Sequence, residues 1–287
     1  MALSALFMYV VFRKIDFKET KNIFLHASPV WLFLAVAAFN ISKIVSSFRL
    51  NIFFKKADLI LGWKYNLRLY YVGMFYNLFL PGGIGGDGYK IYLLNRYFKT
   101  PLKPLISATL LDRVSGMVSL AFLAFILALN LKFPVTGMLP YLLLGALAVL
   151  TYPVLFLAFR IVFRRFLPAF FTTNLYSLVV QAFQLVSAFC ILEAMGVDHM
   201  LYEYLVLFLV SSVVAVLPFT IGGVGARELV FILGSNYLFI DRNTAIAFSL
   251  MFFIVIAVSS FIGVFLETNL KVERSEIPPD GGTQSSK

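Results

Sequence analysis

The stretch LPGGIGGDGYK, from Leu80 to Lys90, decides how this chain is organised, because its pattern returns as LPFTIGGVGAR, from Leu217 to Arg227. Six of the eleven aligned positions are identical, and Lys90 aligns with Arg227. Each copy follows one apolar run and precedes another. A proline followed by several glycines cannot continue a helix, so each copy predicts a helix break in an apolar setting. Paired breaks at matching places in two halves of a chain indicate a transport site within a membrane.

The composition places the chain in a membrane. Of its 287 residues, 61% are hydrophobic and only 13% are charged. A soluble domain is about 45–50% apolar and about 25% charged, so this apolar excess cannot be buried in one water-soluble core. Several apolar runs reach the roughly 20 residues that a helix needs to span a bilayer. The sequence therefore predicts a polytopic α-helical membrane protein.

The charged residues and the single cysteine exclude other classes. The net charge is +10, but the basic residues flank apolar runs, as orientation signals do, and we expect no nucleic-acid partner. Cys190 is the one cysteine, which excludes an internal disulfide and a cysteine-based metal cluster. GGIGGDG resembles a dinucleotide loop only superficially, because no strand precedes it. We expect neither a metal nor a cofactor.

The apolar runs and their punctuation divide the chain into segments. The predicted helices cover 1–12 (a short first span), 29–50, 65–80, 88–97, 104–130, 138–160, 172–196, 202–217, 225–239 and 243–267. Between them we predict an interfacial segment at 13–28 and a basic loop at 51–64. Residues 1–270 form a single transmembrane domain, with repeat halves at about 29–130 and 172–267. Residues 271–287 form a polar, disordered cytoplasmic tail.

Basic residues decide whether the two glycine stretches cross the membrane or turn back. If each stretch is a re-entrant hairpin, the basic residues of 55–68, 96–103 and 160–165 share one side of the membrane. If the stretches cross, these loops fall on opposite sides and break the positive-inside bias. We therefore predict an all-α fold of about six transmembrane helices plus two re-entrant helical hairpins in an inverted repeat, with both termini cytoplasmic.

The predicted hairpin tips carry the candidate binding groups. Irregular backbone at membrane depth is tolerated only where it is buried in protein or lines a wet cavity. The helices that start near Gly88 and Gly225 should direct their N-termini to such a cavity, where an anion is favoured. The tips comprise Pro81, Gly82, Gly83, Gly85, Gly86, Gly88, Pro218, Gly222, Gly223 and Gly225. In a purely structural alternative, the prolines only stop helices and the glycines only permit close packing.

Charged residues near the tips and inside one span form the candidate site. Lys90 and Arg227 lie in the first turns after the tips, where a compensating negative group is expected. That group is Asp87, Asp112, Glu228 or a ligand phosphate. As an alternative, Asp87 only caps the helix that follows it.

Asp112 and Arg113 lie about 12 Å inside the span 104–130. Charges at that depth are costly and usually face an interior path or a partner. Asp112 shares one helix face with Ser115, Gly116 and Ser119, which we expect to point inward. The structural alternative is an ion pair of Asp112 with Arg227 or Lys90.

Three polar stripes recur at helical spacing. They are Asn40, Lys43, Ser47 and Asn51; Asn66, Tyr70, Gly73 and Asn77; and Asn174, Ser177, Gln181, Gln184 and Ala188. Such a stripe lines a cavity or bonds to neighbouring helices, and the sequence alone does not separate the two roles.

Three motifs together resemble a known family. LPGGIGGDGYK, LDRVSG (Leu111 to Gly116) and IGGVGARE (Ile221 to Glu228) are similar to the lysylphosphatidylglycerol synthase transmembrane region, also called the flippase-like family. The resemblance covers roughly residues 1–270. It implies a multi-pass protein of a bacterial or archaeal cell membrane that is linked to lipid translocation. Some members carry a soluble aminoacyl-transferring domain, whereas about 17 polar residues follow the last predicted span here, so we expect no lysyl transfer by this chain alone.

The leading hypothesis is a flippase-like transporter that moves an anionic or polar-headgroup lipid between leaflets. Its partners are membrane lipids, and a homo-oligomer is compatible with the sequence. Lys90, Arg113 and Arg227 would attract the headgroup, and Asp87, Asp112 and Glu228 would balance charge or relay protons.

Two alternatives belong to other classes. One is the membrane component of a lipid aminoacyl- or glycosyl-transferase system, similar to phosphatidylglycerol lysyltransferase, with a separate soluble catalytic subunit. The other is a secondary transporter for a soluble anion. The sequence shows no catalytic constellation, so we do not expect enzyme activity from this chain by itself.

Overall fold

The described part of the chain is helical throughout. The computed structural model describes residues 23, 25–79, 85–131, 137–216 and 225–272, and it contains no strand in these ranges. In chain order the elements are α3 (Pro29–Lys56), α4 (Trp63–Phe79), α5 (Gly85–Phe98), α6 (Leu102–Ala128), α7 (Leu139–Ile161), the 3-10 helix η2 (Arg164–Ala169), α8 (Phe170–Ala194), α9 (Leu201–Val216), α10 (Ala226–Leu238) and α11 (Arg242–Val272).

The expected all-helical membrane architecture is confirmed in its coarse form. Within the described residues, five helical segments are long and apolar enough to cross a membrane: Pro29–Lys56, Leu102–Ala128, Leu139–Ile161, Arg164–Ala194 and Arg242–Leu266. They correspond to five of the six predicted spans. The first predicted span, at 1–12, the tail beyond 272 and most of the interfacial segment at 13–28 lie outside the described residues.

Three predicted helix boundaries were wrong. The helix predicted at 29–50 continues to Lys56, through the first part of the predicted loop 51–64. It continues because Phe53 and Phe54 are fully buried, so that apolar packing holds these residues in the helix despite the lysines after them. The helix predicted at 88–97 begins at Gly85. The helix predicted at 243–267 continues to Val272, so it includes the first two residues of the predicted tail.

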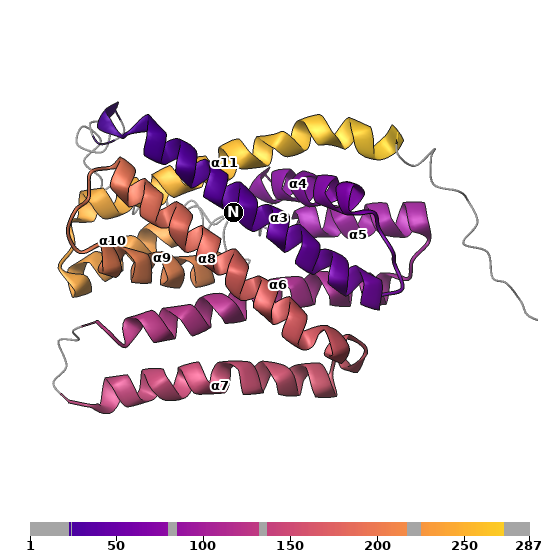
Figure 1. Ribbon diagram of the computed structural model, residues 1–287, viewed down its shortest axis with the longest axis horizontal. Coiled ribbons are helices and arrows are strands. Elements are labelled where there is room, and N and C mark those ends of the chain that lie inside the picture. Colours follow the sequence, from indigo (N-terminus) through magenta and orange to yellow (C-terminus); the bar gives the residue numbers. More distant parts are fainter. Residues whose placement is uncertain (1–22, 24, 80–84, 132–136, 217–224, 273–287) are drawn as a thin grey trace, which may run out of the picture.

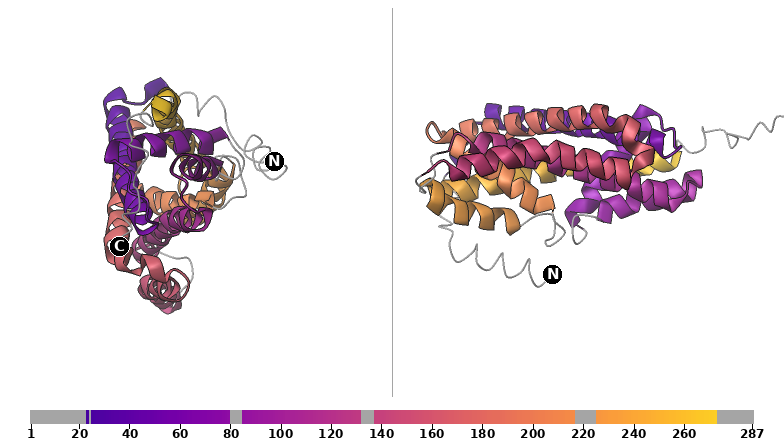
Figure 2. Two further views of the ribbon diagram at one scale, coloured as in Figure 1. Left: turned by 90° about the vertical axis from the view of Figure 1, so that its right-hand side faces the viewer. Right: turned by 90° about the horizontal axis from the view of Figure 1, so that it is seen from below.

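The long helices run along the long axis of the molecule, and the shorter helices occupy its two ends (Figure 1). The α4–α5 pair lies at one end, and the α9–α10 pair lies at the other. Helix α3 packs along α8, and α11 packs against α4. Helix α7 lies at the edge of the bundle beside α6 (Figure 2). Large apolar side chains on α7, such as Leu142, Val149 and Val154, are exposed.

Two apolar cores surround the two short-helix pairs. One core joins α9, α10 and α11 to the beginning of α3 and the end of α8. The other joins α4 and α5 to the end of α3, the first half of α6, the end of α7, η2 and the beginning of α8. Aromatic rings dominate both; for example, Phe208, Phe231 and Phe252 belong to the first, and Phe53 and Phe159 to the second. The space between these cores is where the candidate site lies.

A glycine contact sets the distance between α4 and α5. A Cβ atom on Gly86 would lie 1.8 Å from the carbonyl oxygen of Gly73, which is far inside van der Waals contact. The backbone N–H of Gly86 also donates to the Asn77 side-chain oxygen at 2.8 Å. Gly86, which we predicted as part of a hairpin tip, is therefore a helix-packing residue in the first turn of α5.

This contact predicts that Gly86→Ala destabilises the protein while Gly88→Ala does not. The new methyl group at Gly86 would push α5 away from α4, which we expect to cost about 1–3 kcal/mol. Gly88 has nothing within 4 Å of its would-be Cβ, so alanine there should be neutral or slightly stabilising. Thermal unfolding of the two variants in the same detergent measures the difference. Equal melting temperatures for the two variants would show that α5 does not depend on this close approach.

Candidate functional site

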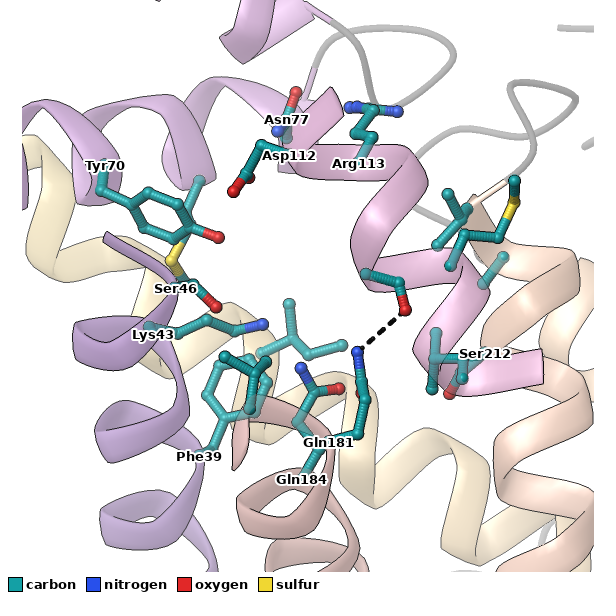
Figure 3. Close-up of a pocket in the computed structure, with 18 of the residues that line it drawn as sticks. Phe39, Lys43, Ser46, Tyr70, Asn77, Asp112, Arg113, Gln181, Gln184 and Ser212 are labelled. Carbon is teal, nitrogen blue, oxygen red and sulfur yellow. Dashed lines mark hydrogen bonds between the residues drawn. The ribbon is translucent and has the colours of Figure 1, made fainter. Parts of the chain in front are cut away.

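A cavity of about 290 Å³ lies between the two apolar cores. Side chains from α3, α4, α5, α6, α8, α9, α10 and α11 line it, so both short-helix pairs contribute. Figure 3 shows polar side chains from several of these helices directed into one space. The end of α4 reaches the cavity through Leu78, which lies two residues before the first motif. The end of α9 reaches it through Val216, which lies directly before the second motif.

The cavity carries an excess of positive charge. Among the described residues, five basic side chains and two carboxylates line it: the basic ones are Lys43, Arg49, Lys90, Arg113 and Arg227, and the carboxylates are Asp87 and Asp112. Charges held among apolar helices are costly unless each is paired, hydrogen-bonded or in contact with water or a ligand. The pairing of these seven groups therefore determines what the cavity can bind.

Arg49 and Asp112 form a buried ion pair between α3 and α6. The Nε atom of Arg49 lies 2.7 Å from Oδ1 of Asp112, and Arg49 Nη1 donates to the Ser177 hydroxyl of α8 at 2.8 Å. Arg49 is 4% exposed and Asp112 is 7% exposed. The guanidinium lies over Gly116, where a Cβ would approach Nη1 to 3.4 Å. One arginine thus ties three helices together at the wall of the cavity.

Asp87 pairs with two cations at the start of α5. Lys90 Nζ lies 2.7 Å from one carboxylate oxygen, and Arg113 Nε lies 2.5 Å from the other. The Lys90 stem fills the space above Gly73, whose would-be Cβ is 2.8 Å from Lys90 Cε. The Lys90 ammonium also lies 5.1 Å from the ring centre of Tyr70. The negative group that we expected beside Lys90 is therefore Asp87.

Arg227 and Lys43 are arranged differently from the other cations. Arg227 lies 5.0 Å from the Phe252 ring centre and donates weakly to the Ser212 hydroxyl at 3.4 Å. Lys43 Nζ lies 4.4 Å from the ring centre of Phe39. Neither cation has a carboxylate within ion-pair distance among the residues that the structure describes.

Glu228 does not line the cavity. One carboxylate oxygen accepts the Gly225 backbone N–H at 2.6 Å, and the other accepts the Ser249 hydroxyl at 2.9 Å. Gly225 has a φ of 87°, a conformation that favours glycine, and it caps α10. Glu228 therefore fastens the beginning of α10 to α11, and its predicted role in charge balance at the headgroup remains a prediction.

The structure brings most of the predicted charged residues together. Asp87, Lys90, Asp112, Arg113 and Arg227 line one cavity; the first four come from the consecutive helices α5 and α6, and Arg227 comes from α10, about 100 residues later in the chain. Of the predicted tip residues, Gly85, Gly86 and Gly88 belong to the first turn of α5 and Gly225 caps α10. Pro81, Gly82, Gly83, Pro218, Gly222 and Gly223 lie outside the described residues.

The alternative ion pair of Asp112 with Arg227 or Lys90 is wrong, because Asp112 pairs with Arg49. Sequence reasoning missed Arg49, which we had placed only at the end of a span. Lys43, Ser46 and Arg49 follow one another at a spacing of three residues, and all three line the cavity. That spacing was the available signal for a polar face on α3.

The polar stripes have both of the roles that the sequence left open, because some of their residues bond to neighbouring helices and others line the cavity. Asn40 joins three helices, because it donates to Ser259 of α11 and accepts from Tyr71 of α4. Gln181 and Gln184 of α8 line the cavity. On α6, the inward face predicted from Asp112 is confirmed, since Ser115 and Ser119 are fully buried.

The Arg49–Asp112 pair predicts strong coupling between the two residues. Arg49→Met leaves a buried carboxylate without its cation, which we expect to cost about 3–5 kcal/mol. The double variant Arg49→Met/Asp112→Asn removes both charges and should be more stable than Arg49→Met alone. Thermal unfolding of the two single variants and the double variant completes the cycle. Additive losses would show that the two charges do not stabilise each other.

Comparison with known proteins agrees with this membrane architecture. No curated protein matches the sequence. The family model described as "Lysylphosphatidylglycerol synthase TM region" matches residues 1–263, which is most of the chain. The chain therefore belongs to the lysylphosphatidylglycerol synthase transmembrane-region family.

Proposed function

We propose that this protein is a flippase-like transporter that moves a lipid with an anionic or polar headgroup between leaflets through the central cavity. The observation that carries the proposal is the cavity's lining, which has five basic side chains and two carboxylates among apolar helices. A headgroup that crosses a bilayer needs a polar path, while its acyl chains can stay in lipid. A positively charged interior favours a negatively charged headgroup on that path.

The short helices support a re-entrant arrangement. Helices α4, α5, α9 and α10 have 17, 14, 16 and 13 residues, which are fewer than the roughly 20 that a span needs. The two pairs lie at opposite ends of the molecule in Figure 1, and their motif-proximal ends line the same cavity. We infer that α4–α5 and α9–α10 are hairpins that enter from opposite faces, as in an inverted repeat.

The distribution of charge supports an orientation. The basic residues at one end of the bundle are Lys55, Lys56, Lys64, Arg96, Lys99, Lys103, Arg160, Arg164 and Arg165. Arg165 pairs with Asp58 there, which joins η2 to the chain after α3. By the positive-inside bias this end faces the cytoplasm, and we propose that both termini lie on that side.

A second candidate function rests on the family's own description, which names a synthase. In that case the chain is the membrane component of a lipid aminoacyl- or glycosyl-transferase system, and a separate soluble subunit carries out the chemistry. The two functions differ in a measurable way, because only the transporter exchanges lipid without a second protein.

Reconstitution of the purified chain tests the transporter. In vesicles of phosphatidylcholine and phosphatidylglycerol, with and without an imposed pH gradient, we expect the protein to exchange acyl-labelled phosphatidylglycerol faster than labelled phosphatidylcholine. Arg227→Ala should slow this exchange about tenfold, because it removes a charge-assisted contact. The assay is quenching of the label in the outer leaflet.

Lys55→Ala is the matched control, because Lys55 is an exposed cation at the end of α3 and does not line the cavity. Its exchange rate should equal that of the unmodified protein. If the unmodified protein exchanges lipid no faster than protein-free vesicles under either condition, the transporter is excluded and the transferase component is favoured.

A further inference from the structure

We propose that Lys43 and Arg227 together bind the phosphate group of a ligand, and that Gln181 accepts a hydrogen bond from a hydroxyl on the same ligand. The lipid nature of that ligand rests on the proposed function. The phosphate-and-hydroxyl chemistry itself rests only on the cavity.

The five cavity cations fall into two groups. Arg49 forms an ion pair with Asp112, and Lys90 and Arg113 form ion pairs with Asp87. These three cations and two carboxylates form compact, hydrogen-bonded clusters. Lys43 and Arg227 have no carboxylate within 4.0 Å among the described residues, so their charge is available to a ligand.

Lys43 and Arg227 lie on neighbouring aromatic rings. Lys43 lies over Phe39 and Arg227 lies over Phe252, and the centres of these two rings are 5.8 Å apart. Cation–π contact positions a charge without neutralising it. Two like charges held in a low-dielectric space repel each other, and an anion placed between them would attract both and offset that repulsion. Figure 3 shows the Lys43 amine directed into the cavity.

The two motifs differ at the position three residues before the basic residue. When they are aligned, Lys90 matches Arg227, but Asp87 matches Val224. The first copy therefore supplies the carboxylate that pairs with its own cation, whereas Glu228, which follows Arg227, accepts hydrogen bonds from Gly225 and Ser249 instead. This difference assigns the ligand to the cation of the second half, although the sequence pattern treats Lys90 and Arg227 as equivalent.

The described part of the cavity wall holds a buried acceptor without a hydrogen-bond partner. Gln181 is 3% exposed and lines the cavity. Its Nε2 donates to the Gly116 carbonyl at 3.2 Å, which fixes the orientation of the amide. Its Oε1 has no hydrogen-bond partner in the described structure, and neither has the buried Ser260 hydroxyl that also lines the cavity. A buried acceptor without a donor is costly, so the site calls for a donor from the ligand.

The donor is a hydroxyl rather than an ammonium group. An ammonium in this cavity would be repelled by Lys43 and Arg227, whereas a neutral hydroxyl would not. The ligand class is therefore a phosphate ester that carries a hydroxyl. Such chemistry occurs in a lipid headgroup and in a free soluble phosphate ester, and the experiment separates these sources.

Binding to the full-length protein in detergent tests the proposal. The probes are dihexanoyl phosphatidylglycerol and dihexanoyl phosphatidylpropanol, which have the same charge and differ in the headgroup hydroxyls, together with glycerol 3-phosphate and inorganic phosphate. We expect phosphatidylglycerol to bind more tightly than phosphatidylpropanol. Lys43→Gln and Arg227→Gln should each weaken the binding of both lipids about tenfold, because each variant loses a charge-assisted contact. Isothermal titration calorimetry provides the dissociation constants.

Three further variants separate the parts of the site. Gln181→Met should abolish the preference for phosphatidylglycerol and leave the affinity for phosphatidylpropanol unchanged. Lys90→Gln should weaken binding much less than Arg227→Gln, because Asp87 already satisfies the Lys90 charge. Arg227→Lys keeps the charge and should recover most of the affinity, which distinguishes a binding role from a folding role.

The outcomes are decisive for each part. Unchanged affinity in both Lys43→Gln and Arg227→Gln would overturn the phosphate site, and an equal loss in Lys90→Gln would overturn its asymmetry. A retained preference in Gln181→Met would overturn the hydroxyl contact. If glycerol 3-phosphate binds as tightly as the lipid, the phosphate site is supported and its ligand is a soluble phosphate ester. That result would reject the lipid transporter without rejecting the site. Lipid binding without lipid exchange likewise rejects transport while the site stands.

Discussion

The structure depends on how seven charged side chains are accommodated around one cavity inside an apolar bundle. Each isolated charge in such a place costs several kcal/mol, so helix positions must bring partners together. Asp87 and Asp112 do this for three of the five cations, and each carboxylate joins different helices. The ion pairs therefore offset the cost of removing these charges from water, and they also hold together the helices that form the cavity walls.

The glycine-rich motifs also help to accommodate charged side chains around the cavity. They bring helix ends, instead of unbroken helices, to the cavity, and close helix contacts such as Gly86 against Gly73 make room for this. The apolar cores on either side supply the packing that holds the short helices in place. A cavity with polar walls can then exist between two aromatic clusters without water having to solvate the whole bundle.

Much of the fold could be predicted, because apolar runs and helix breakers are local signals. Helices α6 to α10 begin and end within a few residues of the predicted ranges. The boundary of α3 was missed because burial of Phe53 and Phe54 is a tertiary effect that local polarity hides. The inward face of α6 followed from spacing alone, since residues three and four apart share a helix face.

The candidate site was predicted less completely. The sequence by itself determined that buried charges would gather near the two motifs, because glycine and proline break helices locally and charge at membrane depth requires a partner. Only the tertiary structure decided the pairs: Asp112 with Arg49 across 63 residues, and Asp87 with both Lys90 and Arg113. Pairing depends on how each helix is rotated and how closely it approaches its neighbours, and these are properties of the packed bundle that no single segment encodes.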